Sequence, residues 1–94
     1  MGIAMTLGGW NYDEVKGVNL PQKAESAFTE VTSGLVGANY EPVLYAGSQV
    51  VNGVNYCIFA LQTSLTAHPE QRLMKLIINV DSSGKSRLVS VNVI

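Results

Sequence analysis

The sequence predicts a single α+β domain in which one long helix packs across an antiparallel meander sheet of four to five strands. The chain has 94 residues, of which 47% are hydrophobic and 14% charged, and these values suit one small globular core. A single stretch with helical spacing is followed by runs with the two-residue period of strands. Short turn-forming segments separate those runs, so consecutive strands are expected to be neighbours. We therefore predict one domain over residues 1–94.

The N-terminal segment is predicted to be a flexible arm over residues 1–12. Glycine occurs four times in the first nineteen residues, and Gly8 and Gly9 are adjacent. A short strand is expected near Trp10 and Tyr12. Trp10 is expected to pack the arm on the sheet, because large aromatic side chains contribute most when buried.

An amphipathic helix is predicted over residues 21–36. Asn19 is a candidate N-cap, and Pro21 is tolerated in a first helical turn. Apolar residues then recur at spacings of three and four, at Ala24, Ala27, Phe28, Val31 and Leu35. Glycine can close a helix in the left-handed conformation, so the helix is expected to end near Gly34 or Gly37.

The rest of the chain predicts four strands, over residues 41–51, 54–65, 71–81 and 86–93. Asn52-Gly53 suits a tight hairpin turn, because both residues accept positive φ angles. Residues 81–85 indicate a second, longer hairpin loop, and residues 67–70 a turn containing Pro69. Because loops alternate between the two ends of a meander, the turns at Asn52-Gly53 and at residues 82–84 are expected to share one end of the sheet.

Strand alternation predicts which residues face the helix. They are Leu44, Ala46, Tyr56, Ile58, Ala60, Met74, Leu76, Ile78, Val80, Val89, Val91 and Val93. The opposite, outer face is also apolar, with Val43, Tyr45, Cys57, Phe59, Leu61, Leu73, Ile77 and Leu88. An exposed apolar face of this size indicates a partner, and a homodimer through Tyr45, Cys57, Phe59, Leu61 and Ile77 is one prediction. A β-bulge is the alternative, because it would reverse part of the assignment.

Several functional classes are disfavoured by composition. The formal charge is −1 and the six basic residues are scattered, so neither a nucleic acid nor a membrane surface is expected as partner. One cysteine allows no intrachain disulfide, and together with one histidine it cannot form a structural metal site. Cys57 has no evident base, so no catalytic residue, enzyme activity or cofactor is predicted. No signal peptide is visible in the chain, and the localisation stays unknown.

The segment Gln49-Val50-Val51-Asn52-Gly53 resembles the cystatin signature Gln-Val-Val-Ala-Gly. It is followed by Val54-Asn55-Tyr56, similar to the usual Asn-Tyr continuation, and Leu7-Gly8-Gly9-Trp10 resembles the glycine-containing arm of that family. The order of arm, helix, hairpin and meander agrees with stefin-like or phytocystatin-like members. The resemblance implies a cystatin-like fold.

The resemblance also implies reversible, non-covalent inhibition of papain-like cysteine proteases, by insertion of a wedge into the active-site cleft. The residues expected to contact the protease are Gly8, Gly9, Gln49, Val50, Val51, Asn52, Gly53, Ser82, Ser83 and Gly84. The family is also known for dimers in which the first hairpin opens and segments exchange between chains, and the resemblance extends that possibility to this protein.

Two positions depart from the family pattern. Asn52 stands where alanine is usual, and Ser82-Ser83-Gly84 replaces the usual Pro-Trp or Pro-Gly of the second loop. A loop without an aromatic anchor lacks a typical source of interface energy. The alternative function is therefore a non-inhibitory cystatin-fold module that binds or assembles through its apolar outer sheet face.

Overall fold

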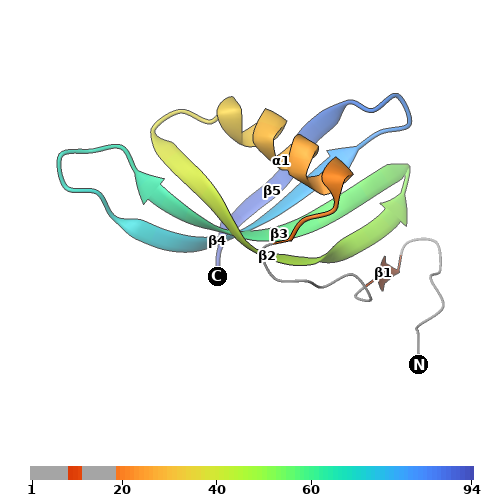
Figure 1. Ribbon diagram of the computed structural model, residues 1–94, viewed down its shortest axis with the longest axis horizontal. Coiled ribbons are helices and arrows are strands. Elements are labelled where there is room, and N and C mark those ends of the chain that lie inside the picture. The colour runs from red at the N-terminus through yellow and green to blue at the C-terminus, as the bar shows by residue number, and fades with distance from the viewer. Residues whose placement is uncertain (1–8, 12–18) are drawn as a thin grey trace.

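Helix α1 (Gln22–Ser33) lies across one face of an antiparallel sheet in the computed structural model, which describes residues 9–11 and 19–94 (Figure 1). The strands follow one another in the order β1-β2-β3-β4-β5. Their bounds are β1 Trp10–Asn11, β2 Ala38–Val51, β3 Gly53–Ser64, β4 Gln71–Val80 and β5 Ser86–Val93. The predicted α+β class and meander order are confirmed, and each long strand lies within three residues of its predicted bounds.

The helix is shorter at both ends than the predicted 21–36. Pro21 occupies the N-cap position without a side-chain hydrogen bond, so the predicted capping role of Asn19 was wrong. At the other end Gly34 is the C-cap, and the hydroxyl of Thr32 donates to the carbonyl oxygen of Phe28 at 2.7 Å. Such side-chain bonds compete with helix propagation. The chain leaves the helix before Val36, whose side chain is 97% exposed.

The core lies between α1 and the middle of the sheet. The helix contributes Ala24, Ala27 and Phe28, and the two alanines are small enough to let the helix backbone approach the strands. The sheet contributes Tyr45, Tyr56, Ile58, Ala60, Met74, Leu76 and Ile78. Each fully buried aliphatic side chain of this kind contributes about 1.5–3 kcal/mol. The helix packs mainly over β4 and β5, which leaves part of β2 uncovered.

Two β-bulges in β2 overturn the predicted faces of its central residues. The register with β3 shifts between Pro42 and Leu44, and again between Tyr45 and Gly47, so Val43 and Ala46 are the extra residues. Tyr45 therefore pairs with Ile58, lies in the core and is 0% exposed, whereas Leu44 pairs with Phe59 on the outer face. The predicted faces of Leu44 and Tyr45 were wrong, because one inserted residue reverses strand alternation, and Ala46 is a half-buried bulge residue outside the ladder.

A third irregularity affects β5. The register with β4 shifts between Ile77 and Ile78, so Val89 has no partner in β4 and stays 47% exposed. Leu88 instead packs against the core, beside Ile78. The predicted faces of Leu88 and Val89 were therefore wrong for the same reason. Val93, also predicted to face the helix, is 58% exposed beyond the region that the helix covers.

The bulges give a direct test of the face assignment. We expect Tyr45→Ala to lower the free energy of unfolding by about 3–5 kcal/mol, because it removes a fully buried aromatic ring. Leu44→Ala is the matched control on the adjacent, half-buried outer position, and we expect less than half of that loss. Urea unfolding measures both. An equal or larger loss for Leu44→Ala would contradict the bulged register.

Candidate functional site

Three segments meet at one end of the sheet, which we call the hairpin end. They are the turn between β2 and β3 at Asn52, the loop between β4 and β5 at residues 81–85, and strand β1 (Figure 1). Strand β1 joins them because Trp10 pairs with Gln49 and Asn11 with Ser48. The two hairpins thus share one end as predicted. Gly9 immediately precedes β1, while Gly8 lies outside the described residues.

The first turn is tighter than the predicted two-residue turn, and of Asn52 and Gly53 only the glycine adopts a positive φ. Val51 pairs with Gly53 and Val50 with Val54, which leaves Asn52 alone at the tip. The backbone of Gly53 has a φ of +94°, a conformation that side-chain-bearing residues rarely adopt. Val50 and Val51 are half-buried, and Asn52 is exposed. The edge of the turn is therefore apolar with one polar tip.

Gly53 also lies directly against the second hairpin. A Cβ at this position would overlap the carbonyl oxygen of Val80 and lie 2.8 Å from the Cα of Asp81. Backbone atoms cannot move aside as a flexible side chain can, so only glycine fits without shifting a strand end. The first turn and the start of the second loop are consequently one packed unit.

The second loop is organised by the carboxylate of Asp81. Its Oδ1 accepts hydrogen bonds from the Ser83 amide at 2.9 Å, the Ser83 hydroxyl at 2.6 Å and the Lys85 amide at 3.0 Å. The Ser83 hydroxyl, followed by the Lys85 amide, holds the pKa of Asp81 below its ordinary value, because these donors favour the charged form. Ser82, Ser83 and Gly84 are all exposed on a loop that is already ordered.

Side-chain amides tie three strands together beneath the first turn. Asn79 donates to the Oδ1 of Asn55 at 2.9 Å, and Asn55 donates to the Oε1 of Gln49 at 3.1 Å. Asn79 is only 5% exposed, and its amide also lies 3.5 Å from the carbonyl oxygen of Asn52. Sequence reasoning missed this row, although an asparagine next to apolar residues in each of two predicted strands was a usable signal. The row holds β2, β3 and β4 in register at the base of the turn.

The outer sheet face keeps four of the five residues predicted for a dimer contact. Cys57, Phe59, Leu61 and Ile77 are half-buried on this face, and Tyr45 is removed from it by the bulges. Lys75, paired with Phe59, places a charge among them. Burial raises the pKa of the Cys57 thiol, and nearby Lys75 lowers it by a smaller amount. The thiol therefore stays protonated near neutral pH and is a poor nucleophile.

The residues that the structure describes give no support for a metal site or for a membrane-spanning helix. There, no group of three His, Cys, Asp or Glu side chains is arranged to hold a metal ion. His68 is exposed in the loop between β3 and β4, at the opposite end from the two hairpins. Over the same residues, no helix has the length and apolar character needed to cross a membrane.

No known protein family, curated protein or solved structure matches this chain. The interpretation of the hairpin end therefore depends on its own geometry and on the motif in the sequence.

The close contact at Gly53 can be tested against a second glycine. We expect Gly53→Ala to lower the free energy of unfolding by about 3 kcal/mol or more, because strain at positive φ adds to overlap with the Val80 backbone. Gly84→Ala is the matched control, since Gly84 also has a positive φ, +87°, but no atom lies within 4 Å of the added Cβ. It should cost about 1–2 kcal/mol. Equal losses in urea unfolding would show that the two hairpins are not packed through Gly53.

The Asp81 carboxylate should make the second loop sensitive to acid. Its pKa in the folded protein is lowered, so its contribution to stability is complete above the ordinary value of 3.8 and is lost as the pH falls through the folded pKa. We expect the Asp81 side-chain carboxyl signal in NMR to titrate below pH 3.8. The wild-type advantage in stability over Asp81→Asn should also shrink on acidification. A variant that is equally destabilised at pH 6 and at pH 2 would contradict this role.

Proposed function

We propose that this protein has a cystatin-like fold and is a reversible, non-covalent inhibitor of papain-like cysteine proteases. The observation that carries the proposal is the packing of Gly53 against Val80 and Asp81. This contact joins the signature-like turn and the second loop into one edge, and strand β1 pairs beside it at Gln49. Three segments at one end of a sheet are the arrangement that wedge insertion requires.

The wedge would act by occupying the protease cleft. Its two loops are already ordered, by the amide row under the first and by Asp81 within the second, so little conformational entropy is lost on docking. Val50 and Val51 supply apolar contact area. Gly53 keeps the first turn packed on the second loop, so the two loops would enter the cleft as one edge. No covalent step is involved, so inhibition would be competitive with substrate.

Not every proposed contact residue acts in the same way. The side chain of Gln49 accepts a hydrogen bond from Asn55, so we assign it to holding the turn rather than to touching the protease. Asn52 is exposed at the tip, where its polar side chain needs a partner in the cleft or loses hydration at a cost of about 1–3 kcal/mol. Ser82, Ser83 and Gly84 would contribute contacts along the second loop.

A second candidate function is a binding module with the same scaffold and no inhibitory power. It is favoured by the second loop, where the exposed residues Ser82, Ser83 and Gly84 offer no aromatic or large apolar anchor. Interfaces obtain much of their energy from a few such anchors. The two candidates differ in one measurable property, the inhibition of an active protease.

Titration of active papain tests the proposal. We expect competitive, fully reversible inhibition with a Ki in the micromolar range or tighter, which corresponds to about −8 kcal/mol or stronger. Val51→Asp should raise the Ki at least about 30-fold, because a charge must be desolvated in the cleft. Val93→Asp is the matched control, a 58% exposed valine outside the hairpin end, and should leave the Ki unchanged.

Absence of inhibition at 100-fold molar excess over micromolar papain would reject the inhibitor and favour the second candidate. Equal effects of Val51→Asp and Val93→Asp would show that the first turn is not the wedge.

A further inference from the structure

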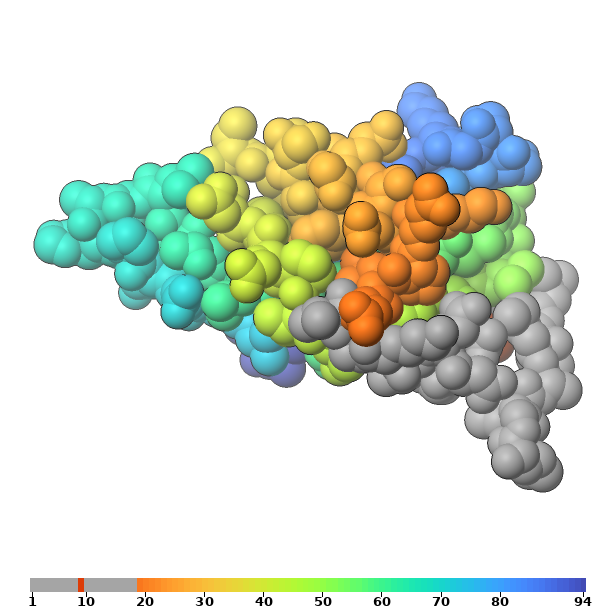
Figure 2. All heavy atoms as spheres, viewed as in Figure 1, coloured from red at the N-terminus to blue at the C-terminus, as the bar shows by residue number. Residues whose placement is uncertain are grey.

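The tip of the first turn carries the one Asn-Gly pair of the chain, Asn52-Gly53. The side chain of Asn52 is exposed, and within the part of the chain that the structure describes no hydrogen bond holds its amide group. In Figure 2 the turn (green) lies at the surface beside the second loop (blue). The amide group of Asn52 is therefore open to water and can rotate.

The residue after an asparagine decides how easily the asparagine side chain reacts with the backbone. The attacking atom is the backbone nitrogen of that next residue, and a side chain on it shields the nitrogen. Gly53 has no Cβ, so its nitrogen is unshielded. Gly53 is held against Val80, so the exposed side chain of Asn52 is the group that moves toward the nitrogen. The Asn52 carbonyl oxygen is held only loosely, by the Asn79 amide at 3.5 Å.

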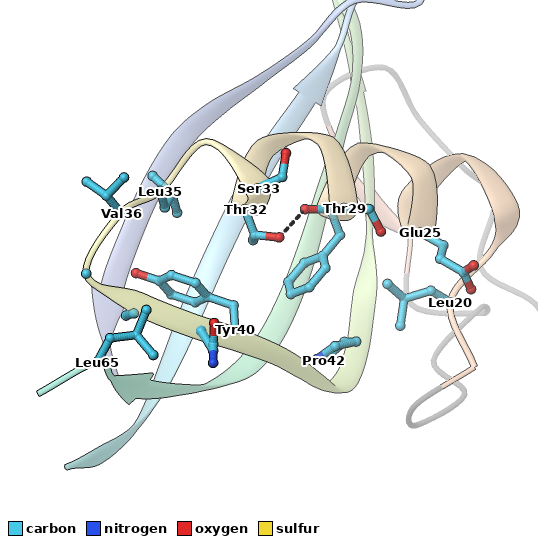
Figure 3. Close-up of a pocket in the computed structure, with 14 residues that line it drawn as sticks. Leu20, Glu25, Thr29, Thr32, Ser33, Leu35, Val36, Tyr40, Pro42 and Leu65 are labelled. Carbon is cyan, nitrogen blue, oxygen red and sulfur yellow. Dashed lines mark hydrogen bonds between the residues drawn. The ribbon is translucent and has the colours of Figure 1, made fainter. Parts of the chain in front are cut away.

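Each of the other asparagines precedes a tyrosine, a leucine or a valine. Asn39 is exposed in β2, but it is followed by Tyr40, whose ring lies in an open groove between α1 and β2 (Figure 3). Asn92 is exposed in β5 and is followed by the branched side chain of Val93. Both asparagines also lie within paired strands, which fix the backbone around them. Exposure alone therefore does not make an asparagine of this chain reactive.

Hydrogen bonds restrain the neighbouring groups that could react in the same way. Asn79 donates to the Oδ1 of Asn55, and Asn55 donates to Gln49, so both amide groups are held in the row under the turn. The carboxylate of Asp81 accepts three hydrogen bonds within its own loop. Asn52 thus combines exposure, an unrestrained amide group and a following glycine.

We propose that Asn52 is a site of spontaneous deamidation. The nitrogen of Gly53 forms a bond to Cγ of Asn52, and the bond from Cγ to the side-chain nitrogen breaks. The side-chain nitrogen leaves as ammonia and takes the proton of the Gly53 amide with it. The resulting succinimide ring takes up one water molecule. Opening of the ring at Cγ gives aspartate, and opening at the main-chain carbonyl carbon gives isoaspartate, so no oxidant or cofactor is needed.

Either product changes the hairpin end. Both place a carboxylate at the tip of a turn that packs on the backbone of Asp81, which is itself charged. Isoaspartate also routes the main chain through Cβ and Cγ, which lengthens the turn by one atom. Because Val51 pairs with Gly53 across this residue and Gly53 packs against Val80, the added atom must disturb one of these contacts. A wedge altered in this way should also inhibit less well, an effect that rests on the proposed function.

Ageing of the full, folded chain at mildly alkaline pH tests the proposal, because the attacking nitrogen loses its proton more readily there. Fragmentation mass spectrometry should find Asn52 converted at least about tenfold faster than Asn39 or Asn92, a barrier lower by about 1.4 kcal/mol. Hydroxylamine, which attacks the succinimide, should cleave the chain between Asn52 and Gly53. Asn52→Gln should lose the fast conversion, since its longer side chain must close a larger ring. Asn92→Gln is the matched control and should leave the conversion at Asn52 unchanged.

The isoaspartyl form can be separated by ion exchange, and we expect it to unfold at a lower urea concentration than the unaged chain. The proposal is overturned if Asn52 converts no faster than Asn39 and Asn92, if hydroxylamine leaves the chain intact, or if Asn52→Gln converts as fast as the wild type. An isoaspartyl form as stable as the unaged chain would overturn the predicted effect on the packing of Gly53. Conversion is read from mass, so this outcome is independent of whether the chain inhibits papain.

Discussion

The close packing of α1 on the sheet, mainly over β4 and β5, is the constraint on which the rest of this structure depends. Ala24 and Ala27 have no side-chain atoms beyond Cβ, so the helix can lie near the fully buried Ile58, Leu76 and Ile78. Apolar burial in that contact offsets part of the conformational entropy lost on folding. Because the helix is committed to β4 and β5, it cannot also cover β2, and the groove beside Phe28 is the consequence.

The sheet adapts to this placement through its irregularities. The bulges on either side of Tyr45 bring its ring under the core, where it packs 6.4 Å from the ring of Tyr56. The same bulges move Leu44 to the outer face and bend β2. Bulged residues and Pro42 also interrupt the open edge of this strand, and such interruptions oppose edge-to-edge pairing with other chains.

The hairpin end is ordered by contacts that need no apolar core. The neutral amides of Gln49, Asn55 and Asn79 satisfy one another across three strands, and Asp81 accepts the hydrogen bonds of its own loop. A docking edge can therefore be rigid while its valines stay partly exposed.

The sequence by itself determined the one-helix meander, the ends of β5 and the shared position of the Asn52-Gly53 turn and the Ser82–Gly84 loop. These follow from periodicity and turn chemistry, which act over a few neighbouring residues. Only the tertiary structure decided the side of Tyr45, the contact of Gly53 with Val80, the amide row and the groove. A bulge depends on which register buries more apolar area, and the close contact at Gly53 depends on two strand ends brought together by the whole sheet. Neither the preferred register nor this contact can be read from a single segment of the sequence.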